Sequence, residues 1–159
     1  MSTQEFKEFE KFLDLMYVYS RKLHPYQVSA RQYGTEDKLF MIEVHTVRTI
    51  GRNPKITITE IAKETERTKS AVSQMVDKLK DKGILEKVKD PEDQRRYVLQ
   101  LTQKGKTIYD YHEALDKENY GIILREMRDV DISDIGSGIK LVGQIIKAMD
   151  DKDNNGLRG

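Results

Sequence analysis

The chain has 159 residues, 37% of them apolar, and a formal net charge of +1 at neutral pH. This length predicts one domain with a hydrophobic core. The absence of cysteine excludes disulfides, thiolate metal sites and thiol redox sensing. No apolar run approaches the roughly 18 residues needed to span a bilayer, and the N-terminal residues are too polar for a signal peptide. We therefore expect a cytoplasmic protein with no membrane partner.

The charge is unevenly distributed along the chain. Residues 55–106 hold 13 Lys and Arg against 9 Asp and Glu, a balance of +4. All other residues hold 15 against 18, a balance of −3. A local basic excess has the sign expected of a surface that faces phosphate groups.

The N-terminal part of the chain predicts two helices. The first runs from about Gln4 to Leu23, because apolar residues recur at steps of three and four, and a His-Pro pair ends it. The second is expected to be capped by Thr35 and to end near Ile50, where Gly51 suits the position just beyond a helix.

A helix-turn-helix pattern follows. Ile56–Ile58 fits a short strand, and Thr59 is expected to cap a short helix, Glu60–Thr65. After a turn of three to four residues, Thr68 is a candidate N-cap for an amphipathic helix, Lys69–Lys82. Two helices joined by such a turn form the helix-turn-helix unit.

The second helix of this pair has one apolar and one polar face. Val72, Val76 and Leu79 predict the buried stripe, and the opposite face carries Lys69, Ser70, Ser73, Gln74, Asp77 and Lys78. Gln can pair with adenine and Ser can contact several bases in the major groove. The lysine at the helix start suits a phosphate. Taken alone, the pattern also fits the solvated face of an ordinary amphipathic helix.

A charged hairpin is predicted directly after this helix. Two strand-like runs, Ile84–Val88 and Tyr97–Leu101, flank the loop Lys89–Arg96, which carries Arg95 and Arg96. A helix-turn-helix followed by a basic hairpin is the arrangement of a winged helix. Nucleic acid is therefore the first partner to consider.

Long apolar stripes mark the helices outside this unit. The last two are expected at Gln103–Arg128, capped by Thr102, and at Ile132–Met149, before a frayed tail from Asp150. The stripes consist of Phe6, Phe9 and Leu13 in the first helix and of Ile132, Ile135, Ile139, Val142, Ile146 and Met149 in the last. Packing against each other would bury them. Pairing with the same helices of a second chain is favoured, because two-fold homodimers are common.

These residues resemble the MarR family of winged-helix regulators. The resemblance is carried by ITEIAKETERTKSAVSQMVDKLKDKGIL and then by DPEDQRRYVLQLTQKG, in which the family's spacing is matched by Asp90, Asp93, Arg95, Leu101, Thr102 and Gly105. It covers nearly the whole chain. It implies a homodimer held by the first helix and the last two, with a wing in the minor groove on each side. Such a dimer reads a palindromic operator in double-stranded DNA.

The resemblance also implies roles for single residues. Arg95 would be the wing-tip arginine in the minor groove, with Asp93 holding it in place and Arg96 adding a contact to the DNA backbone. The major-groove residues would be Thr68, Lys69, Ser70, Ser73, Gln74 and Lys78. Glu66 stands where the family often has Gly. A left-handed conformation costs Glu more than Gly, so a differently shaped turn stays open.

Proteins of this family respond to small aromatic or anionic ligands, to cysteine oxidation or to zinc. The lack of cysteine excludes cysteine oxidation here. An organic ligand would bind where the dimerisation helices meet the winged unit, and its possible lining residues, which also fit ordinary core or interface, are Tyr17, Tyr19, Tyr26, Tyr33 and Tyr111. His45 and His112 resemble positions of zinc-sensing relatives, with Glu43 and His24 as further candidates. The dense ligand cluster of those relatives is missing. We therefore expect no metal and no cofactor.

The sequence thus predicts a mainly α fold, a winged helix-turn-helix with a short β-hairpin wing and with N- and C-terminal helices forming a dimerisation region. A single domain is expected over residues 1–159, with the winged unit at about 52–102 and the dimerisation helices at about 4–24 and 103–150. The expected function is a sequence-specific DNA-binding transcriptional regulator, a ligand-responsive repressor acting as a homodimer, and not an enzyme. The alternative is a winged-helix module that binds protein or RNA without operator binding.

Overall fold

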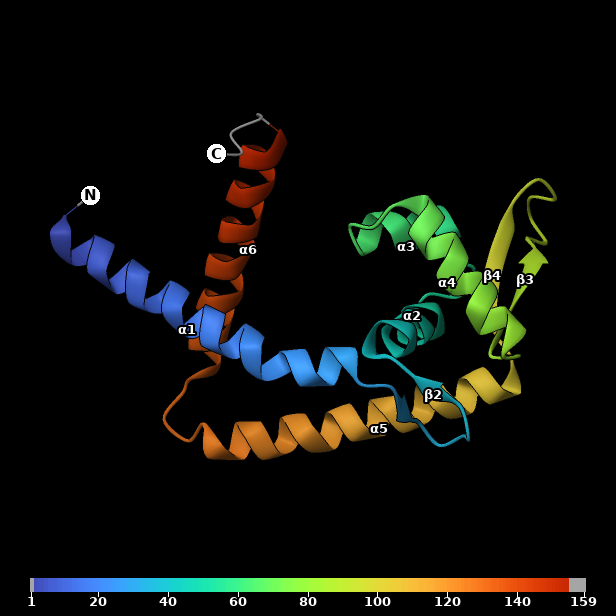
Figure 1. Cartoon of the computed structure of the whole chain (residues 1–159), viewed down its shortest axis with the longest axis horizontal. Helices are drawn as coiled ribbons and strands as arrows, with labels where there is room; N and C mark the ends of the chain where they lie inside the picture. The colour runs from blue at the N-terminus through green and yellow to red at the C-terminus, as the bar shows by residue number, and fades with distance from the viewer. Residues whose placement is uncertain (1, 155–159) are drawn as a thin grey trace. The chain divides into compact units, whose positions relative to one another are not determined.

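The computed structural model describes residues 2–154, which are mainly helical (Figure 1). The helices are α1 (Thr3–Val28), α2 (Met41–Arg52), α3 (Ile58–Glu64), α4 (Lys69–Asp81), α5 (Gln103–Glu126) and α6 (Ile132–Asn154). The strands are β1 (Arg31–Gln32), β2 (Lys38–Leu39), β3 (Leu85–Lys89) and β4 (Tyr97–Leu101). The chain divides after Asp116, inside α5, into two units. The predicted mainly α fold with a two-stranded wing is confirmed.

Helix α1 begins at a capping box and continues further than predicted. The Ser2 hydroxyl accepts from the Glu5 N–H at 3.2 Å, and the Glu5 carboxylate accepts from the Ser2 N–H at 2.6 Å. The helix passes through Pro25 and ends at Val28, so the predicted end at Leu23 is wrong. Proline removes one backbone hydrogen bond. This stretch is largely exposed, so water can satisfy the carbonyl that is left, and one lost bond does not end the helix.

The segment before α2 is a small hairpin, not the start of a helix. β1 and β2 pair antiparallel, and the turn between them contains Gly34, at φ +71°. Helix α2 begins only at Met41, because the Glu43 carboxylate accepts from the Phe40 N–H at 2.9 Å. The predicted cap, Thr35, lies in the hairpin turn. The helix also extends two residues past Ile50, and the predicted terminal Gly51 lies within it.

Helix α3 begins earlier than predicted, at a second capping box. The N-cap is Thr57, not Thr59, and its hydroxyl accepts from the Glu60 N–H at 3.2 Å. The predicted strand at Ile56–Ile58 is wrong as well. The Ile56 carbonyl instead accepts a single hydrogen bond from the Leu99 N–H at 2.8 Å. That bond ties β4 to the beginning of the helix-turn-helix.

One cluster of buried side chains joins α2, α4, the β3–β4 hairpin and α5. It contains Val44, Val47, Ile50, Val72, Val76, Leu79, Ile84, Leu99 and Ile108. Two glycines permit the close approaches. A Cβ on Gly51 would lie 2.5 Å from the Tyr109 ring, and one on Gly105 would lie 2.1 Å from the Ile84 carbonyl oxygen. Both contacts require glycine, and they fix the hairpin and α2 against the first part of α5.

The C-terminal helices differ from the prediction only at their ends. Thr102 precedes α5, as expected, and its hydroxyl accepts from the Gly105 N–H at 3.2 Å. Helix α5 ends at Glu126, two residues before the predicted end, and α6 continues five residues beyond Met149 to Asn154. Residues 150–154 of the predicted frayed tail are therefore helical, and residues 155–159 lie outside the described part. Within residues 2–154, no helix is long and apolar enough to cross a membrane.

Candidate nucleic-acid interface

Helix α4 presents the polar face predicted for a recognition helix. Its N-cap is Thr68, as predicted, and the Thr68 hydroxyl accepts from the Ala71 N–H at 3.2 Å. The helix turns Val72, Val76 and Leu79 into the core. The predicted major-groove residues are exposed apart from one half-buried serine, and they are Thr68, Lys69, Ser70, Ser73, Gln74 and Lys78. The first turn contains no acidic residue, so nothing there repels a phosphate.

The turn before α4 keeps the left-handed geometry despite lacking glycine. Glu66 has φ +52°, and the next residue, Arg67, donates its N–H to the Ala62 carbonyl at 2.9 Å. The Glu66 N–H reaches the Lys63 carbonyl at 3.4 Å. This pair of bonds is a Schellman closure of α3. Glu66 therefore adopts the left-handed conformation that favours glycine. The differently shaped turn that its sequence left open does not form.

The wing is a regular antiparallel pair with a structured tip. Its register runs from Leu85 opposite Leu101 to Lys89 opposite Tyr97. Beyond the strands, the Asp90 N–H donates to the Arg96 carbonyl at 2.9 Å and closes the loop. Two aspartates then shape the tip through backbone amides. The Asp90 carboxylate accepts from the Glu92 N–H at 3.0 Å, and the Asp93 carboxylate accepts from the Arg95 N–H at 3.0 Å.

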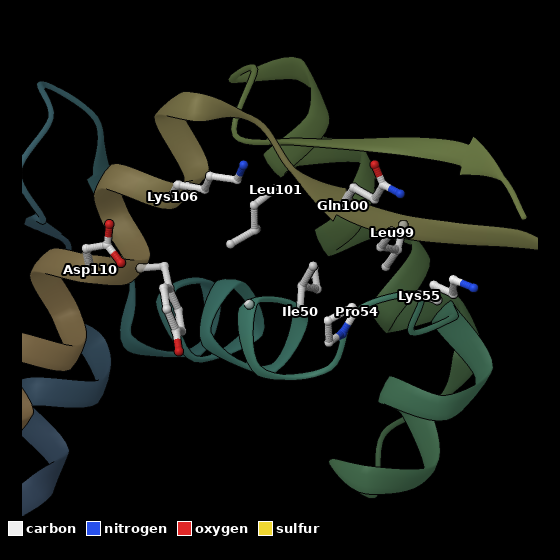
Figure 2. Close-up of a pocket in the computed structure, with 10 residues that line it drawn as sticks. Ile50, Pro54, Lys55, Leu99, Gln100, Leu101, Lys106 and Asp110 are labelled. Carbon is white, nitrogen blue, oxygen red and sulfur yellow. The ribbon is translucent and has the colours of Figure 1, made fainter. Parts of the chain in front are cut away.

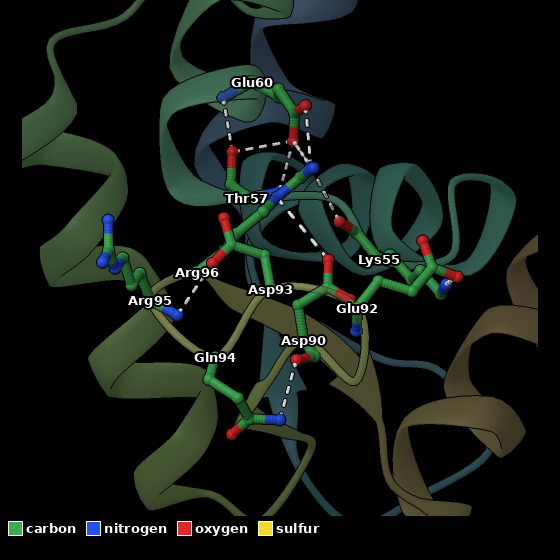
Figure 3. A network of polar contacts seen from close by, with 9 residues as sticks. All are labelled: Lys55, Thr57, Glu60, Asp90, Glu92, Asp93, Gln94, Arg95 and Arg96. Carbon is green, nitrogen blue, oxygen red and sulfur yellow. Dashed lines mark hydrogen bonds and ion pairs between the residues drawn. The ribbon is translucent and has the colours of Figure 1, made fainter.

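The two arginines of the tip point in different directions (Figure 3). The Arg95 side chain extends away from the polar network, and Asp93 holds its backbone, not its guanidinium. The Arg96 guanidinium instead lies on the Glu60 carboxylate, with Nη2 at 3.0 Å from Oε1 and 3.1 Å from Oε2. Its Nε is 3.9 Å from the buried Asp90 carboxylate. In this structure, which holds no DNA, Arg96 makes an intramolecular ion pair, and its contact to the DNA backbone stays a prediction.

Arg96 and Lys55 together anchor the wing to the start of α3. Arg96 Nη2 also donates to the Lys55 carbonyl at 3.3 Å, and Lys55 Nζ lies 2.7 Å from the Glu92 carboxylate (Figure 3). The Thr57 hydroxyl and N–H, with Arg96 adding to them, hold the pKa of Glu60 below its usual range. Glu60 thus stays ionised opposite Arg96. We call these contacts the wing anchor, made by Lys55, Thr57, Glu60, Asp90, Glu92 and Arg96.

Known proteins are similar to this chain in sequence and in fold. Residues 41–96, from the start of α2 to the wing tip, match the model of the MarR family. The HTH-type transcriptional regulator BilQ of Clostridioides difficile (strain CD3) is 21% identical over 103 residues, 65% of this chain and 70% of BilQ. Streptococcus pneumoniae FabT, in a crystal structure with DNA, is 26% identical and matches with a TM-score of 0.71 over 93% of this chain and 99% of FabT. Over residues 41–96 the chain is therefore similar to the MarR family.

A further solved structure supports the MarR fold alone. It is the MarR/EmrR family transcriptional regulator of Acinetobacter sp. ADP1, with a TM-score of 0.68 at 18% identity over 89% of this chain and 97% of that one. The family model confirms the resemblance read from the wing and helix-turn-helix residues, over residues 41–96.

The histidines form a packed pair. The rings of His45, on α2, and His112, on α5, stack with centroids 5.3 Å apart, and Tyr33 meets His112 edge-on at 5.6 Å. Burial is the main reason why the pKa of each histidine is lowered from its usual value. Among the described residues, no group of three or more His, Asp or Glu side chains is placed to hold a metal. His24 lies apart on exposed α1.

The five tyrosines that the sequence offered as ligand contacts do not line one common site. Tyr33 and Tyr111 pack edge-to-face at 6.4 Å, and Tyr33 is buried. Tyr17, Tyr19 and Tyr26 are exposed on α1. Tyr33 therefore belongs to the core of this unit.

Sequence reasoning missed most of the wing anchor. The signal for one part was present, because Thr57 and Glu60 have the Thr-x-x-Glu spacing of a capping box. Reading Thr59 as the cap concealed it. The pairing of Glu60 with Arg96 had no sequence signal, since 36 positions separate the two residues.

Proposed function

We propose that this MarR-like chain is a sequence-specific regulator that binds double-stranded DNA as a homodimer and acts as a ligand-responsive repressor. One observation carries the proposal. The exposed polar face of α4 begins with its N-cap Thr68 and with Lys69, and the first turn of the helix contains no acidic residue. The hairpin that follows carries Arg95 at its tip, and the Arg95 side chain is directed away from the polar network. A groove-reading helix and a minor-groove cation are the two parts that a winged helix uses on DNA.

The wing anchor supports this proposal because it pairs one arginine of the wing and leaves the other exposed. Arg96 is held by Glu60 and Asp90, whereas Arg95 is exposed. A guanidinium that extends from a rigid tip can enter a narrow minor groove without first breaking an ion pair. We infer that Arg95 makes the DNA contact and that Arg96 fixes the tip from which it extends.

The homodimer part of the proposal rests on exposed apolar side chains. In this single chain Phe6 is 54% exposed on α1, and Ile132 and Ile139 are 79% and 70% exposed on α6. Phe9, Leu13 and Ile146 are also exposed, while Ile135 and Val142 are half-buried. Apolar side chains repeated along a helix face indicate a protein interface. A second copy of the chain is the occupant we propose, and a palindromic operator follows from its symmetry.

The family and the named relatives are transcriptional regulators, which agrees with a binding function and not an enzymatic one. The structure of FabT was solved with DNA bound. We propose the same class of partner for this chain, and we propose that the protein works without a cofactor.

The test is a titration of the full chain against duplex DNA from the region upstream of its own gene, with a scrambled duplex of equal length. Affinity is measured by fluorescence anisotropy over a series of salt concentrations. We expect tighter binding to the upstream duplex, and we expect Arg95→Ala to weaken binding and to make its salt dependence shallower. Equal affinity for both duplexes, or preferential binding to RNA, would favour the interaction-module alternative.

A further inference from the structure

Two cavities lie against α2. The larger, of about 530 Å³, lies between α2, β4 and the first turns of α5 (Figure 2). The smaller, of about 210 Å³, lies between α2, α3 and α4 and has room for several water-sized molecules. No methionine is among the 10 residues that line the larger cavity, whereas Met75 lines the smaller one. The smaller cavity therefore gives small molecules access to a sulfur atom of α4.

Met75 lies on the flank of α4, between its buried apolar stripe and its polar face. The side chain is half-buried and packs against the core cluster. The smaller cavity beside it is lined by the buried Ile61 and Val72, and also by the exposed Thr65 and Arg67. Because the cavity reaches exposed polar residues, a small polar oxidant such as hydrogen peroxide can enter it from solvent.

The Met75 sulfur contacts α2 through Thr46. Thr46 Oγ1 lies 2.9 Å from Met75 Sδ and also 2.9 Å from the Ile42 carbonyl oxygen. A hydroxyl has a single proton to donate, and a carbonyl oxygen is a stronger acceptor than a thioether. The proton is therefore held mainly by the carbonyl, and the lone pairs of the sulfur stay available to an electrophilic oxygen.

Oxidation of Met75 needs only a peroxide. The sulfur attacks one oxygen of hydrogen peroxide, an S–O bond forms and the O–O bond breaks. The departing oxygen takes the proton of the attacked hydroxyl and leaves as water, so the sulfur is oxidised and the peroxide is reduced. Arg67 lines the cavity and can stabilise the negative charge that develops on the departing oxygen. No thiol takes part, and the chain has no cysteine.

A sulfoxide does not fit the contact between α2 and α4 that the structure shows. A hydrogen bond between two oxygens alone spans about 2.7 Å, and the sulfur and the Thr46 hydroxyl are only 2.9 Å apart. An oxygen added between them pushes Met75 away from Thr46. An oxygen directed into the cavity instead lies among the apolar side chains of Ile61 and Val72, where it loses hydration. Both outcomes disfavour the present position of α4, whose polar face carries the proposed DNA contacts.

We propose that Met75 is an oxidation site, and that its conversion to the sulfoxide by a peroxide displaces α4 from α2 and lowers DNA affinity. The regulatory half rests on the DNA-binding function proposed above. The modification half does not. The change is reversible, because methionine sulfoxide reductases return the sulfoxide to the thioether.

Modification is tested by mass spectrometry of the folded full chain after treatment with hydrogen peroxide. Tryptic cleavage releases residues 70–78 as a peptide in which Met75 is the only methionine. The synthetic peptide of the same residues, treated in parallel, gives the rate for a fully accessible sulfur. We expect Met75 in the folded chain to gain one oxygen atom at a rate within about tenfold of that in the free peptide. Slower oxidation than this would show that the fold shields the sulfur, and it would overturn the proposal.

Regulation is tested by fluorescence anisotropy on the preferred duplex. Peroxide treatment of the parent chain should raise the dissociation constant for DNA by about fivefold or more. Met75→Leu conserves the side-chain volume, so it should bind the duplex as the untreated parent does, both before and after peroxide. Met149→Leu removes an exposed methionine of α6 and should lose affinity on treatment as the parent does. An equal loss of affinity by Met75→Leu would overturn the regulatory half.

Reversal gives an independent test that needs no variant. Methionine sulfoxide reductases with dithiothreitol should restore the affinity of the oxidised parent chain. Dithiothreitol alone should not, because the chain has no cysteine to reduce. If circular dichroism melting shows that Met75→Leu does not fold, this reversal decides, since affinity has to return together with the unmodified Met75 peptide.

The two halves of the proposal fail in different ways. An oxidised Met75 with unchanged DNA affinity would overturn the regulatory half and leave the modification site in place. If the untreated chain binds no duplex, the proposed function fails, while mass spectrometry still decides whether Met75 is an oxidation site.

Discussion

Glu66 and Gly83 occupy the same position at the ends of the two helices of the helix-turn-helix. Each is the residue just beyond the helix cap, at φ +52° and +67° respectively. In both cases the next residue, Arg67 or Ile84, donates its N–H back into the helix at 2.9 Å. One Schellman closure therefore uses glycine and the other uses a residue with a β-carbon.

This equivalence predicts opposite effects of exchanging the two residue types. A left-handed conformation costs a non-glycine residue roughly 1–2 kcal/mol, so Glu66→Gly should raise the free energy of unfolding by about 1 kcal/mol. Gly83→Ala should lower it by a similar amount. Nothing lies within 4 Å of a Cβ built on Gly83, so that loss is conformational and not a clash. Urea denaturation midpoints measure both changes, and a destabilised Glu66→Gly variant would contradict the assignment.

The Arg96–Glu60 ion pair can be distinguished from a DNA contact by changing the acidic partner. If Arg96 acts by anchoring the wing, Glu60→Gln removes its partner and should weaken DNA binding as Arg96→Ala does. If Arg96 instead binds phosphate, the same change frees the guanidinium and should strengthen binding. Both side chains are about half exposed, so we expect the pair to contribute only about 0.5 kcal/mol to stability. Tighter DNA binding by Glu60→Gln would indicate that Arg96 binds DNA phosphate and does not act by anchoring the wing.

On α4, we expect Gln74 to read bases and Lys69 to bind phosphate. Gln74→Ala should cost roughly 1–3 kcal/mol of binding free energy on the preferred duplex and much less on a scrambled one. Lys69→Ala should weaken both about equally, because a phosphate contact carries no sequence information. Paired titrations at one salt concentration decide this. Equal losses for Gln74→Ala on the two duplexes would assign Gln74 to positioning.

The α6 stripe is expected to hold two chains together. Ile139→Asp places a charge on an apolar interface without a partner, so it should yield monomer or aggregate. Lys140→Asp introduces the same side chain at the adjacent exposed position, outside the stripe, and is the matched control. Analytical ultracentrifugation at micromolar concentration measures the assembly. A parent chain that sediments as a monomer there would rule out the proposed homodimer.

Stability should fall on mild acidification because of His45 and His112. In the folded chain both pKa values lie below the usual histidine value of 6.5, chiefly because burial penalises the charged ring. Below pH 6.5 the unfolded chain therefore takes up protons that the folded chain does not. The stability contribution is complete above that pH and is lost as the pH drops.

Thermal melts between about pH 7.5 and 5.5 should show this loss as a decreasing melting temperature, in a window where carboxylates remain ionised. His45→Gln removes one of the two titrating rings, and it should make the decrease shallower. A melting temperature that is constant across this window in the parent chain would contradict the burial argument.

The sequence by itself determined the parts of this protein that depend on near neighbours along the chain. The three-four spacing of Val72, Val76 and Leu79 specified α4, and the turn residues between two apolar runs specified the hairpin. The same local signals placed the Thr68 cap correctly. They misplaced the C-terminal end of α1, where an exposed proline does not end the helix, and the start of α3, where Thr57 and Thr59 are both possible caps.

Only the tertiary structure decided what Arg96 and Lys55 do. Both had the sequence signature of solvent-facing cations, and their partners Glu60 and Glu92 are 36 and 37 positions away. A salt bridge is chosen by distance in space, which hydrophobic periodicity does not encode. The cavity beside α5 has the same origin, since its walls come from α2, β4 and α5 and exist only once Gly51 and Gly105 let these elements approach.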